Sequence, residues 1–204
     1  MLNVKISKKK LQAIRTRESL LESAVRCFRD NGYLGWSLEA IAQAAAITKG
    51  AIYSHFDSKS ELFIAIINYA YNRALQRTAK LKERLSFVEA ILQVLYECFH
   101  NPAFPIDHKL WAEIIAVAGR DEKVKAVFLR CQSDFQKIIE KWLLEGIRAG
   151  EINSAIDMHS VSDMIVILGN GFLIRPHEAV YNFEKAFKIF ENTIRDILKP
   201  PLKL

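Results

Sequence analysis

The sequence has no long hydrophobic run. Among its 204 residues, the longest stretches free of charged side chains are 62–72 and 164–174, each of 11 residues. A helix needs about 20 apolar residues to cross a bilayer. The amino-terminal part is polar and basic, and it lacks the apolar segment of a secretory signal. We therefore expect no membrane association and a cytoplasmic protein.

Cysteine is scarce, and the residue patterns of common enzymes are absent. Cys27, Cys98 and Cys131 are far apart, with no CxxC pair and no histidine at zinc spacing, so neither a disulfide framework nor a metal site is expected. No phosphate-binding glycine loop, HExxH or GxSxG occurs, and no local pattern pairs a nucleophile with a base. We expect buried thiols, no cofactor and no enzymatic activity.

Charge is distributed unevenly along the chain. Residues 1–60 contain 10 Lys and Arg against 5 Asp and Glu, a net charge of +5 out of the total of +6. Residues 61–204 contain 19 basic and 18 acidic residues. Because neutralisation of phosphates supplies most non-specific affinity for DNA, this asymmetry favours a polyanion-binding amino-terminal segment on a neutral body. On charge alone, a solvated basic tail is the alternative.

Apolar residues recur at helical spacing almost throughout, and no convincing run alternates with the period of a strand. We expect an all-α chain of about nine helices, with Gly32 and Gly150 ending two of them and prolines interrupting others. The expected helices cover approximately residues 14–31, 38–45, 49–55, 59–85, 86–100, 108–118, 121–149, 157–174 and 177–198.

The first 60 residues have the pattern of a helix-turn-helix. Ser37 and Thr48 have the chemistry to cap a second and a third helix. Between these helices, residues 44–47 supply the small and apolar residues that a tight bend requires. The third helix then offers short polar and aromatic side chains to a major groove. Ser58 and Glu61 form a capping-box pattern at the start of a long fourth helix.

This amino-terminal segment resembles the DNA-binding domain of the TetR family of bacterial repressors. The resemblance spans roughly residues 17–62 and includes Phe28, Gly32, Tyr33 and the run SLEAIAQAAAITKGAIYSHFDSKSEL at 37–62. Beyond residue 62 it is architectural only. It implies a DNA-binding domain at residues 1–60, with a basic amino-terminal arm, and a helical ligand-sensing and dimerisation domain at residues 61–204.

The resemblance also implies roles for individual residues. Thr48 and Lys49 correspond to contacts with base edges and phosphates, and Gly50 permits close approach of the backbones. Lys59 corresponds to a phosphate clamp at the start of the fourth helix. The full set of implied DNA-binding residues is Ser37, Thr48, Lys49, Gly50, Ala51, Tyr53, His55 and Lys59. By contrast, Ile52 and Phe56 are expected in the core.

Two positions depart from the family's pattern. Ala46 stands where the family usually has Gly, which predicts a bend strained by on the order of 1 kcal/mol if its φ is positive. Ala51 stands where a hydroxyl residue is common, although its methyl group is able to contact thymine. Two interpretations stay open elsewhere. The basic stretch 5–17 is either an arm along the DNA or a disordered tail, and Tyr33 and Trp36 either pack in the core or donate to a phosphate.

For residues 61–204, the resemblance implies an effector cavity and a dimer interface. A cavity needs apolar walls with a few polar groups, and the candidates are Phe104, His108, Trp111, Ile115, Phe128, Phe135, Trp142, Met164 and Asn170. The interface candidates on the last two expected helices are Ile165, Leu168, Gly169, Phe172, Phe187, Phe190 and Ile194. Ordinary core packing is the alternative for each of these side chains.

The sequence thus predicts a ligand-responsive transcriptional regulator, in the first instance a repressor. It would bind a palindromic DNA operator as a homodimer, with two heads about one helical turn apart, and be released by a small, largely apolar effector. The alternatives are an activator on the same fold and a helical adaptor that does not bind DNA specifically.

Overall fold

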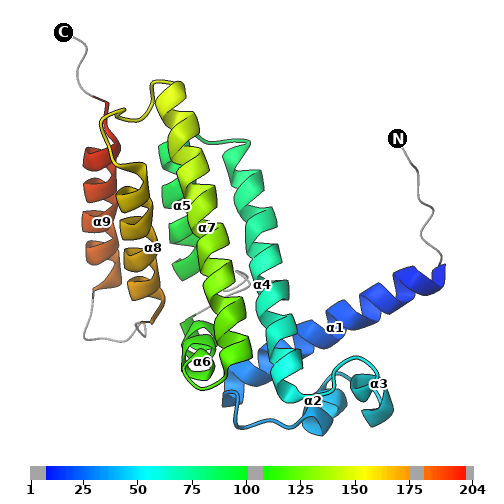
Figure 1. Cartoon of the computed structure of the whole chain (residues 1–204). Helices are drawn as coiled ribbons and strands as arrows, with labels where there is room; N and C mark the ends of the chain where they lie inside the picture. The colour runs from blue at the N-terminus through cyan, green and yellow to red at the C-terminus, as the bar shows by residue number, and fades with distance from the viewer. Residues whose placement is uncertain (1–7, 101–107, 175–181, 201–204) are drawn as a thin grey trace. The chain divides into compact units, whose positions relative to one another are not determined.

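The computed structural model describes residues 8–100, 108–174 and 182–200, so the cavity candidate Phe104 lies outside the described residues (Figure 1). Within these ranges the chain forms nine α-helices and no strand, which confirms the expected all-α class. None of the described helices is long and apolar enough to cross a bilayer. The helices are α1 (Lys8–Asn31), α2 (Leu38–Ala44), α3 (Lys49–Tyr53), α4 (Lys59–Lys82), α5 (Phe87–His100), α6 (His108–Ala118), α7 (Glu122–Arg148), α8 (Met158–Ile174) and α9 (Phe183–Leu198).

Most helix ends agree with the expected ones, and the expected caps are confirmed. Ser37, Thr48 and Ser58 accept hydrogen bonds from the amides three residues later, at 3.2, 3.1 and 3.1 Å. Two helix starts differ by six residues from the expected ones: α1 begins earlier, at Lys8, and α9 begins later, at Phe183. The residues added to α1 include Lys, Leu, Gln and Ala, which all favour helix even without an apolar stripe.

The chain divides into two compact units. The first unit comprises residues 1–69 and 113–127, and the second comprises residues 70–112 and 128–204. The first unit therefore extends beyond the boundary expected near residue 60, and it includes the end of α6 and the start of α7. The helices α4, α6 and α7 each contribute residues to both units.

The first unit has an apolar core in which three aromatic rings meet. The ring of Phe63 lies 5.2 Å from that of Phe28 and 5.0 Å from that of Tyr33, and the Phe28 and Tyr33 rings are stacked at 5.7 Å. Ile52 and Phe56 are buried, as expected. Such aromatic contacts stabilise beyond the area that they bury, by about 0.5–1.5 kcal/mol per pair.

Two carboxylates attach residues 113–127 to the rest of the first unit. The backbone amide of Tyr33 donates to Glu113 Oε2 at 2.8 Å, and Ser60 Oγ donates to Asp121 Oδ2 at 2.6 Å. Asp121 also accepts from the amides of Lys123 and Val124 at the start of α7. One residue thus serves both as a helix cap and as a tertiary contact.

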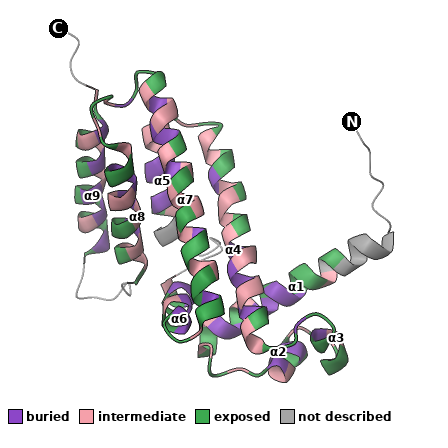
Figure 2. Ribbon diagram, in the orientation of Figure 1, coloured by how far each residue is buried: buried purple, intermediate pink, exposed green. Residues whose placement is uncertain are grey.

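The second unit is a helical bundle with one continuous core. Its buried residues come from α5, α7, α8 and α9 and from Ile152, and α5 packs against both α8 and α9. The ring of Phe172 on α8 makes edge contacts with the rings of Phe183, Phe187 and Phe190 on α9. In Figure 2, α9 has a buried side and an exposed side, as expected for an amphipathic helix on a bundle.

The backbone conformation of Ala46 predicts that its replacement by glycine will stabilise the protein. Its φ is 54°, and it is the one non-glycine residue in the described ranges with a positive φ, which confirms the strained bend. Glycine adopts this conformation without steric cost. We expect Ala46→Gly to raise the free energy of unfolding by about 0.5–1 kcal/mol in urea denaturation. The control is Ala45→Gly, at a φ of −86°, which should lower it. A stabilising effect at Ala45, or none at Ala46, would contradict the strain argument.

Candidate nucleic-acid interface

The candidate interface is built on α3, a five-residue helix held from both sides. Thr48 caps its first turn, and Ser54 Oγ donates to the carbonyl of Ala51 at 2.7 Å after its last. Ile52 is completely buried, and α3 packs against α2. A helix this short depends on such contacts because it cannot form stably alone.

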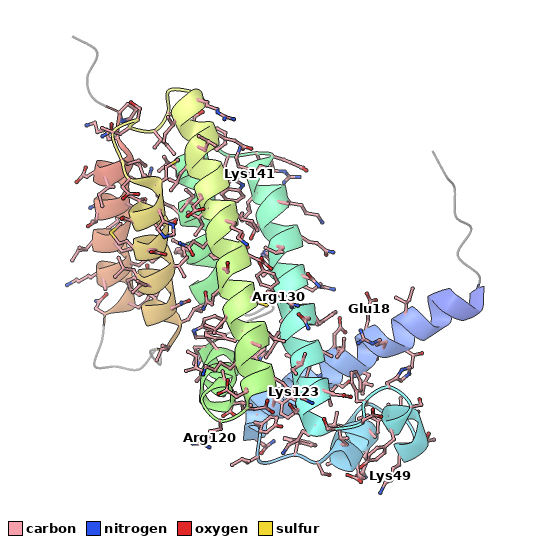
Figure 3. All side chains as sticks on the ribbon, in the orientation of Figure 1. Glu18, Lys49, Arg120, Lys123, Arg130 and Lys141 are labelled. Atoms are coloured by element: carbon pink, nitrogen blue, oxygen red, sulfur yellow. The ribbon has the colours of Figure 1, made fainter. Side chains whose placement is uncertain are left out.

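The other side of α3 is open to solvent. Thr48, Lys49, Gly50, Tyr53 and His55 are exposed, and Ala51 is partly exposed. A methyl group added at Gly50 would meet no atom of the protein within 4 Å, so the backbone there leaves space for a close partner. Figure 3 labels Lys49 at this outer surface. The structure thus brings most of the expected DNA-binding residues together.

Glu39 on α2 holds two of these side chains. Its Oε1 accepts a hydrogen bond from Tyr53 Oη at 2.8 Å and pairs with Lys49 Nζ at 2.9 Å. These two bonds lower the pKa of Glu39 to about 2, with Lys49 as the larger cause. The same carboxylate raises the pKa of both Lys49 and Tyr53. One carboxylate oxygen of Glu39 therefore accepts from both Lys49 Nζ and Tyr53 Oη, the two donors that a phosphate would need.

Glu39 is not among the residues that the sequence predicts to bind DNA. It lies 10 positions before Lys49 and 14 before Tyr53, too far along the chain for contact within one helix or strand. Only the bend between α2 and α3 brings Glu39 to the other two side chains. The one available signal was that Glu39 is the single charged residue between Asp30 and Lys49.

Lys59, which the resemblance assigns as a phosphate clamp, contacts the protein's own backbone in this structure. Its Nζ donates to the carbonyls of Tyr33 at 2.8 Å and Trp36 at 3.1 Å, and lies 4.3 Å from the centroid of the Tyr33 ring. The side chain is half-buried. Lys59 thus fixes the connection between α1 and α2 in this structure, and its ammonium is already in use.

Comparison with known proteins supports the interpretation of this site as a nucleic-acid interface. Residues 20–66 match the model of bacterial regulatory proteins of the tetR family. The chain is 30% identical over 162 residues to the HTH-type transcriptional regulator UidR of Escherichia coli, a match that covers 78% of this chain and 80% of UidR. The chain belongs to the TetR family of bacterial regulatory proteins. It is therefore a transcriptional regulator, and its relatives are regulators rather than enzymes, as the sequence predicted.

Two further proteins extend the comparison. The HTH-type transcriptional repressor NicS of Pseudomonas putida is 37% identical over 84 residues, covering 41% of this chain and 40% of NicS. A TetR-family regulator from Cytophaga hutchinsonii superposes with a TM-score of 0.79 at 23% identity, covering 98% of this chain and 100% of that one. The TetR fold therefore extends over both units of the chain.

The cavity candidates of this TetR-family chain lie in different surroundings. Ile115 belongs to the first unit, and the other described candidates belong to the second. Phe135 and Trp142 line a cavity of about 10 Å³ with residues of α4, α5 and α8, which has room for about one water molecule. The remaining described candidates are His108, Trp111, Phe128, Met164 and Asn170, of which Trp111 is buried and the others are half-buried.

Most dimer candidates on α8 and α9 face the core of their own subunit. Phe172 is half-buried in the aromatic cluster, and Leu168 is 40% exposed. The exposed apolar side chains on these helices are the candidate Leu168 and three residues outside the candidate set, namely Ile167, Ile174 and Ile189. The core candidates, which offer little surface to a partner, are Ile165, Gly169, Phe187, Phe190 and Ile194.

The Glu39 contacts predict a variant that binds DNA more tightly. Glu39→Gln removes the charge that holds Lys49 and that repels phosphates, so we expect severalfold tighter binding to a mixed-sequence duplex. The salt slope should steepen by up to about one unit per half-site. Fluorescence anisotropy at several salt concentrations measures both quantities.

The matched control is Glu18→Gln, which makes the same charge change on α1 of the same unit (Figure 3). An equal gain in the two variants would reveal only the effect of net charge. Unchanged or weaker binding by Glu39→Gln would contradict the assigned role of Glu39.

Proposed function

We propose that the chain is a homodimeric repressor that binds a palindromic operator through α3 and is released by a small effector bound in the second unit. The observation that carries the DNA-binding part is the exposed outer side of α3, where Lys49 and Tyr53 are held by a single replaceable carboxylate. Repression is supported by the match to NicS, which is a transcriptional repressor.

Recognition would use α3 as the element in the major groove. Lys49 and Tyr53 would exchange the Glu39 oxygen for phosphate oxygens, and Thr48 and Ala51 would lie against base edges. Thr48 keeps its hydroxyl hydrogen for a base, since its oxygen accepts from the amide of Ala51. Lys59 would contribute through the shape of the α1–α2 connection more than through a phosphate contact.

Dimerisation is supported by an apolar stripe on α8. Ile167 is 67% exposed and Ile174 is 51% exposed, and a methyl group added at Gly171 between them would meet no atom within 4 Å. The spacing of four and three residues places these three on one side of the helix. An exposed apolar stripe of this kind is typical of a protein–protein interface, and a two-fold dimer would match the symmetry of a palindrome.

Selection of bound duplexes from a random pool tests the proposed function. The purified protein should enrich an inverted repeat, because two identical heads read two identical half-sites. Tyr53→Ala should fail to enrich it while keeping the helical circular dichroism spectrum of the parent protein. Enrichment of a single unrepeated site would exclude the dimeric mode. Absence of any enrichment at moderate salt would favour a helical protein that does not read DNA.

The oligomeric state provides a separate prediction. Ile167→Asp places a charge at the most exposed apolar residue of the proposed stripe, so sedimentation equilibrium should show a dimer weakened by at least about tenfold in dissociation constant. Leu129→Asp serves as the control, since Leu129 is 54% exposed on α7 of the same unit and should leave the dimer unchanged. Persistence of the dimer in Ile167→Asp would place the interface elsewhere.

A further inference from the structure

Within the described residues of the second unit, three buried hydrogen-bonding atoms have no partner. They are Tyr71 Oη, Trp111 Nε1 and Gln132 Nε2, and they come from α4, α6 and α7. Buried polar groups in folded proteins nearly always form hydrogen bonds, because burial without a partner loses the bonds made to water. Three such groups in one unit therefore need an explanation.

The three groups lie near the same part of α7. The Trp111 ring packs on the ring of Phe128, with centroids 5.5 Å apart. Gln132 follows Phe128 by one helical turn. Tyr71 interacts electrostatically with Asp134 and Cys131, on either side of Gln132 in the sequence. Residues distant in the sequence thus come close to the same stretch of α7, residues 128–134.

A small apolar cavity lies farther along two of the same helices. Its volume is about 10 Å³, and Thr78 on α4 and Phe135 on α7 are among its lining residues. Thr78 lies seven residues after Tyr71, and Phe135 lies three after Gln132, so each pair shares a side of its helix. The cavity has room for about one water molecule, so an organic ligand would have to displace side chains to occupy this apolar region beside the polar groups.

Two of the three groups are able only to donate: the indole nitrogen of Trp111 and the amide nitrogen of Gln132. The Tyr71 hydroxyl is protonated at neutral pH, with a pKa that burial raises to about 12, so it has a hydrogen to donate, although its oxygen also accepts. A molecule that satisfies all three must present acceptor atoms, and a purely apolar molecule would leave all three donors unpaired.

We propose that the effector is an apolar molecule that carries oxygen acceptors, in carbonyl, carboxylate or hydroxyl groups, and that Tyr71, Trp111 and Gln132 donate hydrogen bonds to them. This inference rests on the proposed function, in which the second unit binds an effector. It refines that function, since the effector expected from the sequence was defined only as largely apolar.

A matched pair of probes tests the acceptor requirement. Acetophenone has a carbonyl, and ethylbenzene has almost the same shape without one. The protein, labelled with ¹⁵N in its three tryptophans, is titrated with each probe, and Trp111→Phe assigns the indole signal. Acetophenone should move the Trp111 indole proton downfield in a saturable manner, and Tyr71→Phe or Gln132→Met should weaken binding on the order of fivefold. No shift at its solubility limit, or an equal shift with ethylbenzene, overturns the proposal.

The stability of the ligand-free protein provides a second measurement. Gln132→Met removes an unpaired donor and should raise the thermal midpoint. Gln136→Met, one turn later, removes an amide that donates to Ser162 and Asp163, and should lower it. Equal losses in both variants would show that Gln132 is already partnered and would overturn the proposal. Neither experiment contains DNA, so its outcome is independent of whether an operator is bound.

Discussion

The first unit depends on the way in which Tyr33 is held. Its ring packs against Phe28 and Phe63, its amide donates to Glu113, and its carbonyl accepts from Lys59. The Lys59 ammonium also lies over the ring, where the electron-rich face attracts a cation. Every polar group of the Tyr33 backbone and the face of its ring are therefore engaged. This one residue connects α1, α4 and the part of α6 in the first unit, and it begins the connection that leads to α2.

Net charge gives an incomplete account of how such a unit meets DNA. Lys49 and Lys59 count equally in the charge of the amino-terminal segment, yet they differ physically. The Lys49 side chain is 68% exposed and pairs with a carboxylate, which under the proposed function a phosphate would replace with little change in the local interaction. Lys59 is half-buried and neutralises the partial charges of two carbonyls, so moving it to a phosphate would release the α1–α2 connection. The charge available to DNA is therefore set by which lysines have replaceable partners.

Features that depend on nearby residues could be predicted from the sequence, whereas features that depend on tertiary contacts could not. Caps at Ser37 and Thr48 and the burial of Ile52 and Phe56 could be predicted, because each depends on residues within a few positions. The strained bend at Ala46 was implied by the family resemblance, in which Gly usually stands there. The role of Glu39 could not be predicted, since its contact with Tyr53 exists only once α2 and α3 are bent together. Apolar periodicity also cannot separate the core of a subunit from its interface. Phe187 and Phe190 share a stripe typical of either, and only the packing of Phe172 shows that their rings face inward.

An unpaired donor of the second unit and a carboxylate of the first are close neighbours in the sequence. Trp111 and Glu113 are both residues of α6, two positions apart, which corresponds to about 3 Å of helix rise. Trp111 carries an unpaired indole nitrogen, and Glu113 holds the amide of Tyr33. Two positions of α6 therefore separate a polar atom that the proposed effector would pair from a carboxylate whose partner is already fixed within the first unit. Neighbouring residues of one helix thus have different tasks, which apolar periodicity in the sequence does not distinguish.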